Sequence, residues 1–324
     1  MGQPVAPTGD RGSGRFVLLP ERRGRGPSSL RDGLSEDAAE KILHRGPSNL
    51  DPAGKSGSAV AMAKCVGVVL SGCGSGDGSE VREAVLTLLS LERGGAEPVC
   101  LAPDLTQSRV VDHLSGKVDP AASPRRVPAE AARIARGQLR DIASVRDNEL
   151  DALIFPGGDG VASVLSNYAD KGVVCNVHPE VERLLKAMLA RRRPMGFLCM
   201  APILAARVLG PVAGVRITFG PRACEEAKHA AVMGADVRPC PVRDIVVDQK
   251  ISVVSTPAYM YDDARLADVA VGIDKAVRMV LSLARDRRPR PEPGPMEKPE
   301  VKAPPPAGQP RPAGEPIVRK RPGP

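Results

Sequence analysis

Short apolar runs alternate with helical repeats through the middle of this chain. Four continuous apolar runs are typical of strands that are buried on both faces: residues 65–70, 98–102, 151–158 and 195–199. Between such runs, apolar residues recur at helical spacing, as they do over 181–189. This alternation predicts an α/β fold, in which a mainly parallel, doubly wound, flavodoxin-like sheet is covered by helices on both faces.

Three further apolar segments extend the predicted sheet, at residues 215–219, 244–248 and 251–256. Because only two residues separate the last two segments, we expect an antiparallel hairpin at the sheet edge. An amphipathic helix over 262–286 closes the domain. The buried face of the first helix is predicted to consist of Val81, Ala84, Val85, Leu88 and Leu89.

Composition divides the chain into three parts. Residues 1–63 are rich in Gly, Pro, Arg and Ser, and residues 287–324 hold 13 prolines with 9 basic and 4 acidic side chains. Such segments have too few apolar residues to build a core, so we expect two disordered extensions. They flank one predicted domain over 64–286. The partner of the basic, proline-rich tail is not specified by its sequence.

The net charge of +8 comes from the extensions, because residues 64–286 hold 28 basic and 27 acidic side chains. A neutral domain in a chain with no Trp, three Tyr and four Phe is poorly suited to nucleic acid. The seven cysteines include no CxxC pair, which argues against a disulfide framework or a zinc site. No apolar run approaches the length of about 18 residues that a membrane span needs. We therefore predict no metal, no nucleic-acid partner, no membrane association and no secretion.

Three loops follow the carboxyl ends of predicted strands, where ligands bind in open α/β sheets. They are the glycine-rich loop 71–80, the turn 156–160 and the corner from Cys199 to Pro202. A strand-to-helix corner displays its side chain above the sheet, and Pro202 suits the first turn of a helix. The positive end of that helix is expected to lower the pKa of Cys199 from about 8.5 toward neutrality and so create a nucleophile. The alternative is a small buried cysteine.

Backbone N–H groups beside this corner are candidates to bind an oxyanion. Met200 follows the thiol directly, and Gly157 or Gly158 supplies a second N–H from the neighbouring loop.

Motifs spread in order over 64–286 carry a resemblance to a known family. They include VVLSGCGSGDGSEVREAVLTLL, DALIFPGG, GFLCMAP, PCPVRDIVVDQ and VVSTPAYM. Together they resemble the ElbB family of the PfpI-like, class I glutamine amidotransferase-like superfamily, which includes a bacterial isoprenoid-biosynthesis glyoxalase and vertebrate mitochondrial relatives. The resemblance implies a glutathione-independent, cofactor-free glyoxalase-like lyase acting on methylglyoxal or glyoxal. It also implies a homodimer in mitochondria, with the cytoplasm as the alternative.

By this resemblance Cys199 occupies the superfamily's elbow-cysteine position. Glu80 matches the carboxylate that contacts this cysteine in related enzymes. Such a carboxylate should have a raised pKa and hold a proton for transfer. Glu80 also suits a helix N-terminus, which is its alternative role. Glu83, one turn further along, is assigned to a solvated face.

Three departures from the family pattern bear on activity. Met200 stands where hydrolases and amidases of the superfamily often carry histidine, and Asp159 stands where relatives favour an aromatic residue. Pro221 follows Gly220 where relatives tend to carry a polar residue or histidine. They leave open a second hypothesis, a catalytically weak or inactive redox-sensing or interaction protein that uses the same thiol.

Two further residues are candidates for the pocket. A glutamine amidotransferase needs a Cys-His-Glu triad, and no histidine suits that role late in the domain. His113 lies in a motif that resembles the family and is the histidine we place near the site. Cys73 either is fixed by packing or faces the same pocket as a second thiol able to resolve an oxidised Cys199.

Overall fold

The computed structural model describes residues 63–284, except 108 and 221–223. The expectations for the N-terminal extension up to residue 62, for the tail over 287–324 and for Pro221 lie outside these residues.

Seven strands form the central sheet, in the order β12-β13-β9-β8-β1-β2-β7. All neighbouring pairs run parallel except β12 and β13, which form the expected antiparallel hairpin at one edge. The strands are β1 (Cys65–Val69), β2 (Glu97–Ala102), β7 (Leu139–Asp141), β8 (Ala152–Phe155), β9 (Met195–Leu198), β12 (Val246–Asp248) and β13 (Val253–Thr256). The prediction of a mainly parallel α/β sheet is confirmed.

The centre of the sheet is the core of the domain. Every residue of β1, β8 and β9 is buried, so both faces of the sheet are covered. Phe155 and Phe197 stand side by side on β8 and β9 and stack with their ring centroids 5.2 Å apart. Burial of each ring contributes about 1.5–3 kcal/mol, and the stacked pair supports the loops that follow both strands.

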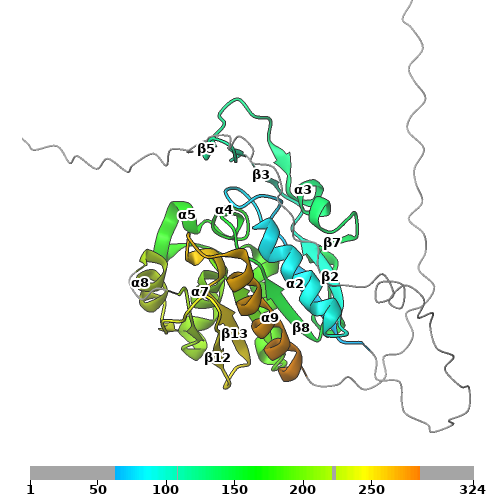
Figure 1. Cartoon of the computed structure of the whole chain (residues 1–324), viewed down its shortest axis with the longest axis vertical. Coiled ribbons are helices and arrows are strands. Elements are labelled where there is room, and N and C mark those ends of the chain that lie inside the picture. The colour runs from blue at the N-terminus through cyan, green and yellow to red at the C-terminus, as the bar shows by residue number, and fades with distance from the viewer. Residues whose placement is uncertain (1–62, 108, 221–223, 285–324) are drawn as a thin grey trace, which may run out of the picture. The chain divides into compact units, whose positions relative to one another are not determined.

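Two pairs of helices cover the sheet. Helices α2 (Val81–Arg93) and α9 (Leu266–Leu283) pack against each other, and Figure 1 shows them side by side on one face. Helices α6 (Pro179–Ala190) and α7 (Pro202–Ala213) form the second pair, and α7 contacts β9. The shorter helical elements are α3 (Val127–Ile134), α4 (Gly160–Ser163), α5 (Tyr168–Lys171), α8 (Glu225–Val232), and the 3₁₀ turns η1 (Ile142–Ser144), η2 (Asp147–Glu149), η3 (Gly172–Val174) and η4 (Ala258–Met260).

The predicted orientation of α2 is wrong in part. Ala84 is buried and Leu88 packs against the core, as expected. Val81, Val85 and Leu89, however, are among the exposed large hydrophobic residues. The buried face consists of Glu83, Ala84, Thr87, Ser90 and Leu91. The apolar pattern did not identify the buried face of α2, because three of these five residues are polar. Contacts with α9 and the loops bury them.

The segment predicted as a strand at 215–219 lies outside the central sheet. Only β10 (Arg216–Ile217) is extended there, and it pairs in parallel with β11 (Asp236–Val237). Two small antiparallel pairs, which the sequence did not predict, lie between β2 and α3. They are β3 (Thr106–Gln107) with β6 (Arg125–Arg126), and β4 (Val111–Asp112) with β5 (Lys117–Val118).

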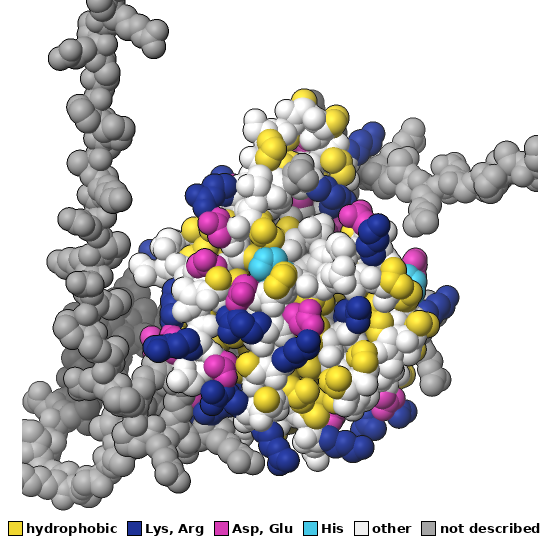
Figure 2. Space-filling view, turned by 180° about the vertical axis from the view of Figure 1, so that it is seen from behind, with side chains coloured by type: hydrophobic (Ala, Val, Ile, Leu, Met, Phe, Trp, Pro, Cys, Tyr) yellow, Lys and Arg dark blue, Asp and Glu magenta, His cyan; other side chains and the backbone are white. Residues whose placement is uncertain are grey.

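Acidic and basic side chains are interspersed over the face of the domain seen in Figure 2. This distribution agrees with the near balance of charge counted over 64–286. None of the helices in the described ranges is long and apolar enough to cross a membrane.

Candidate functional site

Cys199 lies at the corner between β9 and α7, in a backbone conformation that is unusual for a residue with a side chain. Its φ is +55°, a left-handed value that costs on the order of 1–3 kcal/mol when it is not glycine. Two backbone hydrogen bonds stabilise the corner. Cys199 N–H donates to Thr256 O at 3.1 Å, and Ala201 N–H donates to Leu198 O at 2.8 Å. The residue is only 8% exposed, so the thiol is displayed at the sheet edge but shielded from water.

The three predicted loops meet above this edge. Glu80 N–H donates to Gly157 O at 2.9 Å, which joins the glycine-rich loop to the turn after β8. Gly160 N–H donates to Gly78 O at 3.0 Å, which adds a second link between the same loops. Such pairing of loop backbones satisfies buried polar groups and fixes the walls around the thiol.

Gly157 allows these loops to approach the thiol closely. A Cβ atom added there would lie 2.4 Å from the Cys199 Cβ and 2.7 Å from Glu83 Oε2. Both distances are far inside van der Waals contact, so only glycine fits without moving the thiol or the carboxylate.

Glu83 is the carboxylate beside the thiol. It is fully buried and lies beside the Cys199 side chain. Its Oε2 accepts from Gly157 N–H at 2.8 Å and its Oε1 from Tyr259 N–H at 3.3 Å. Burial raises the pKa of Glu83 to about 7, although the hydrogen bonds from Gly157, Tyr259 and Cys199 oppose the rise.

The prediction that Glu80 contacts the thiol and that Glu83 faces solvent is therefore wrong. Glu80 is the N-cap of α2, and its Oε2 accepts from Glu83 N–H at 2.6 Å. Its side chain turns back to the free N–H groups of the helix, whereas Glu83 lies on the inward face of the first turn. No signal in the sequence marked Glu83 as buried, since Thr87 and Ser90, which share its buried face, are polar as well.

The expected fall in the pKa of Cys199 is also contradicted. Burial raises the pKa of the thiol well above its ordinary value, and the charge of Glu83 raises it further. Interactions with the N–H groups of Gly158 and Met200 act in the opposite direction. Repulsion between thiolate and carboxylate arises only when both have ionised, so the pair retains at least one proton near neutral pH.

Two of the three N–H groups predicted to bind an oxyanion lie near enough to the Cys199 thiol to lower its pKa. The N–H groups of Gly158 and Met200 interact with Cys199, whereas the N–H of Gly157 is taken by Glu83 Oε2. Gly158 adopts a φ of +101°, and a Cβ there would meet Gly78 O at 2.3 Å, so this position also requires glycine.

A pocket of about 710 Å³ opens above the thiol. Its described lining residues come from the glycine-rich loop, the first turn of α2, the other two loops, the start of α8 and the segment after β13: Ser75, Gly76, Glu80, Arg82, Gly158, Asp159, Cys199, Met200, Cys224, Glu226, Tyr259, Met260 and Asp262. No histidine is among these described residues, which leaves them without the base of an amidotransferase triad. Tyr259 and Arg82 were not predicted from the sequence.

His113 does not line this pocket. Its Nε2 accepts from Gly76 N–H at 3.1 Å and its Nδ1 lies 3.1 Å from Val111 O, which assigns the proton to Nδ1. A Cβ on Gly74 would lie 2.5 Å from the ring, so the imidazole packs tightly against the glycine-rich loop. His113 is a positioning residue for that loop, whose Ser75 and Gly76 line the pocket.

Cys73 does not line the pocket either. Burial raises the pKa of its thiol, and Glu130 and Arg133 on α3 are the charges with the largest further effect on it. The residue is partly buried and packs against the core, which favours the structural role over that of a resolving thiol.

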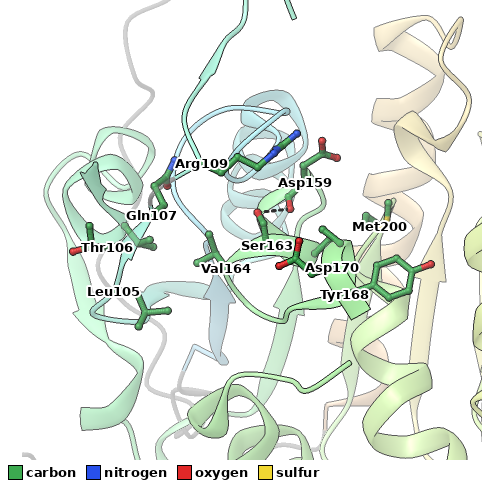
Figure 3. A pocket seen from close by; sticks show the side chains of 13 residues that line it. Leu105, Thr106, Gln107, Arg109, Asp159, Ser163, Val164, Tyr168, Asp170 and Met200 are labelled. Carbon is green, nitrogen blue, oxygen red and sulfur yellow. Dashed lines mark hydrogen bonds between the residues drawn. The ribbon is translucent and has the colours of Figure 1, made fainter. Parts of the chain in front are cut away.

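A second pocket of about 650 Å³ adjoins the first, because Asp159 and Met200 line both. Figure 3 shows Arg109 and Asp159 at one side of it and Tyr168 and Asp170 at another. In the part of the chain that the structure describes, no group of three or more His, Cys, Asp or Glu side chains could hold a metal ion.

Comparison with known proteins identifies the family, although no family model matches the chain. The chain is 44% identical over 227 residues to the human protein "Glutamine amidotransferase-like class 1 domain-containing protein 3, mitochondrial", covering 67% of this chain and 82% of the relative. It is 34% identical over 235 residues to the "ES1 protein, mitochondrial" of Danio rerio, covering 67% and 85%. The localisation in these names confirms the mitochondrial assignment.

A solved structure has the same fold at 33% identity and a TM-score of 0.64. It is an isoprenoid biosynthesis protein with an amidotransferase-like domain from Ehrlichia chaffeensis, and the match covers 69% of this chain and all of that one. The resemblance to the ElbB family, noted in the motifs, is thereby confirmed across the described domain. The chain belongs to the ES1 and ElbB-like family of glutamine amidotransferase-like class 1 domain proteins.

Proposed function

We propose that this protein is a cysteine-dependent, cofactor-free enzyme that converts small α-oxoaldehydes such as methylglyoxal or glyoxal into 2-hydroxy acids. One observation carries the proposal: the Cys199 thiol and the Glu83 carboxyl lie side by side, both buried, at the floor of a pocket. The superfamily includes glyoxalase-like enzymes, and a nucleophile paired with a proton carrier is what this chemistry requires.

The first step is addition of the sulfur to the aldehyde carbon. The C–S bond forms while the C=O π electrons move to oxygen, and the thiol proton passes to Glu83 or to the new alkoxide. In the proposal, the N–H groups of Gly158 and Met200, which interact with the sulfur, stabilise the developing alkoxide. The product of this step is a hemithioacetal.

The second step moves a hydrogen within the substrate. The Glu83 carboxylate removes the proton from the carbon that bears sulfur, and the electron pair forms an enediolate. Glu83 returns this proton to the neighbouring carbon, and the hydroxyl proton moves from the oxygen on the sulfur-bearing carbon to the neighbouring oxygen. The result is a thioester of the 2-hydroxy acid, which water hydrolyses to release the acid and the thiol. One carbon is oxidised and its neighbour reduced, so the electrons balance within the substrate.

The pKa of Glu83 suits this role. A group that must both accept and return a proton works best when its pKa lies near the working pH, and burial raises the pKa of Glu83 to about 7. Glu80 has a different task in the proposal, because its carboxylate caps α2 at the rim of the pocket.

The test is the consumption of methylglyoxal, with lactate measured as product. We expect Cys199→Ser to abolish turnover and the matched change Cys73→Ser, on a thiol outside the pocket, to leave kcat/KM within about twofold. Equal rates in the wild type and Cys199→Ser would contradict the proposal.

The second hypothesis, a regulatory thiol protein without turnover, is favoured by a different observation. Burial raises the pKa of Cys199 well above its usual value, and a protonated thiol is a weak nucleophile. The alkylation rate of Cys199 against pH separates the two hypotheses. A single ionisation above about pH 8, together with no carbonyl turnover, would support the regulatory role.

A further inference from the structure

Among the residues that the structure describes, more acidic than basic groups line the pocket above Cys199. Of its described lining residues, one carries a guanidinium, which is Arg82. Four carry carboxylates: Glu80, Asp159, Glu226 and Asp262. The floor of the pocket adds to this charge, because ionisation of Glu83, which leaves one proton on the Cys199–Glu83 pair, places a further negative charge there.

The nearby cations are already directed at partners. Arg82 Nη1 donates to Tyr259 OH at 3.2 Å, and its guanidinium lies 5.7 Å from the centroid of that ring. Arg109, in the neighbouring pocket, donates to the carbonyl oxygen of Gly76. By contrast, within the ranges that the structure describes, none of the four carboxylates forms an ion pair with a basic side chain.

The neighbouring pocket offers acceptors to the same ligand. Asp159 lines both pockets, and the second one adds the carboxylate of Asp170 (Figure 3). Gln107 also lines it, and this residue is only 6% exposed. Its Oε1 is buried with no hydrogen-bond partner among the described residues. A buried acceptor without a donor is costly, but this oxygen has almost no exposed surface, so the acceptors that the second pocket offers to a ligand are its two carboxylates.

We propose that this pocket selects α-oxoaldehydes that carry a cationic group, such as an ammonium or guanidinium, at the end remote from the reacting carbonyl. The inference takes the reaction from the proposed function, and it takes the preference for cationic substrates from the charge of the pocket. Asp159 is the carboxylate best placed to receive the cationic end, because it forms the wall between the two pockets. Met200, Tyr259 and Met260 line the pocket beside it and suit the uncharged part of the substrate.

The same charge acts on the product. The 2-hydroxy acid carries a carboxylate that the substrate lacked, and a pocket with excess negative charge repels it. Clefts lined by one sign of charge change the local concentration of charged ligands by about 10- to 10³-fold, and salt weakens the effect. Anionic oxoaldehydes are excluded for the same reason.

The experiment compares three phenylglyoxals that share one reacting head. Their para substituents are trimethylammonio, hydrogen and carboxylate, and initial values of kcat/KM are measured with the full chain at low and high ionic strength. We expect the cationic compound to exceed the anionic one by about ten- to hundredfold at low salt, with the ratio falling as salt rises. A ratio of one, or a preference for the anion, would overturn the inference.

Two charge-neutralising variants locate the effect. Asp159→Asn is expected to reduce the cation-to-anion ratio by at least about threefold. Glu225→Gln makes the same change in charge on α8 at a residue that does not line the pocket, and it should leave the ratio within about twofold. Equal effects of the two variants would assign the preference to the overall charge of the domain and overturn the role of Asp159.

A second measurement separates failure of the inference from failure of the proposed function. The rate at which Cys199 reacts with trimethylammonioethyl, methyl and sulfonatoethyl methanethiosulfonates is followed by peptide mass spectrometry. Faster labelling by the cationic reagent with no turnover of any glyoxal would support the charge selection and contradict the reaction. Turnover of the glyoxals with faster labelling by the anionic reagent would support the reaction and contradict the charge selection.

Discussion

Glu80 and Glu83 lie one helical turn apart at the start of α2, and their surroundings differ in every respect that matters for chemistry. Glu80 is at the rim of the pocket, where its carboxylate caps the helix. Glu83 is fully buried, accepts two backbone hydrogen bonds and contacts the Cys199 thiol. The comparison shows that residue type and position beside the glycine-rich loop do not identify the carboxylate that contacts the thiol. Which of the two side chains enters the core depends on the direction in which each points from the helix.

The largest expected difference between these two acids is in catalysis. If Glu83 carries the proton, Glu83→Gln should lower kcat/KM for methylglyoxal by about 10²–10⁴-fold. Glu80→Gln keeps an acceptor at the cap and should lower kcat/KM by less than about tenfold. Steady-state kinetics on both variants measures the contrast, and a larger loss in Glu80→Gln would reverse the assignment.

The pH dependence of stability should show the second difference. The pKa of Glu83 rises from 4.5 to about 7 on folding, so between these values the folded state binds more protons than the unfolded state. Stability therefore falls as pH rises from about 4.5 to 7, by about 2–3 kcal/mol from this group.

Glu83→Gln removes this titration, so the free energy of unfolding of the variant relative to wild type should increase between pH 5 and pH 8. Urea denaturation at both values measures the change. Glu92→Gln, on an exposed position of the same helix, is the control and should show no such trend. A parallel pH dependence in wild type and Glu83→Gln would mean that Glu83 is ionised in the folded protein.

The close approach of the loops to the buried pair gives the third expectation. Gly157→Ala places a methyl group against the thiol and the Glu83 carboxylate and should cost about 1–3 kcal/mol in the free energy of unfolding. Gly76→Ala is the comparison at the rim, since the nearest atom there is a side-chain carbon of Val111 at 3.1 Å, which has room to move. A smaller loss for Gly157→Ala than for Gly76→Ala would show that the loops adapt.

The smallest effect belongs to the cap itself. Glu80→Ala leaves the Glu83 N–H without its acceptor and should destabilise the fold by about 0.5–1 kcal/mol, measured by denaturation at pH 7. Glu92→Ala is the matched control on the exposed side of α2. Equal losses would indicate that helix propensity, rather than capping, accounts for the change.

The sequence predicted much of the fold, because βα alternation has few physical solutions. Short, continuous apolar runs indicate strands that are buried on both faces, as in a parallel sheet. The two residues that separate the last two apolar segments indicated the edge hairpin. The segment at 215–219 misled because its apolar residues pair with β11 in a separate small sheet. Local pattern does not reveal which of two sheets a short strand joins.

The candidate site was predicted in part. The corner at Cys199 and the meeting of three loops followed from the rule that strand ends gather at one edge. Glu83, the pairing of Arg82 with Tyr259, and the positions of His113 and Cys73 away from the pocket did not follow, since each depends on contacts between segments far apart in the chain.

By itself, the sequence determined the sheet, the thiol at its edge and the glycines that let three loops converge there. The tertiary structure alone decided the protonation of that thiol and the identity of its partner. The sequence places Cys199 at a helix N-terminus, which favours a thiolate, but burial and the Glu83 charge outweigh that local field. Desolvation depends on everything packed around a group, and that surrounding is assembled only when the chain has folded.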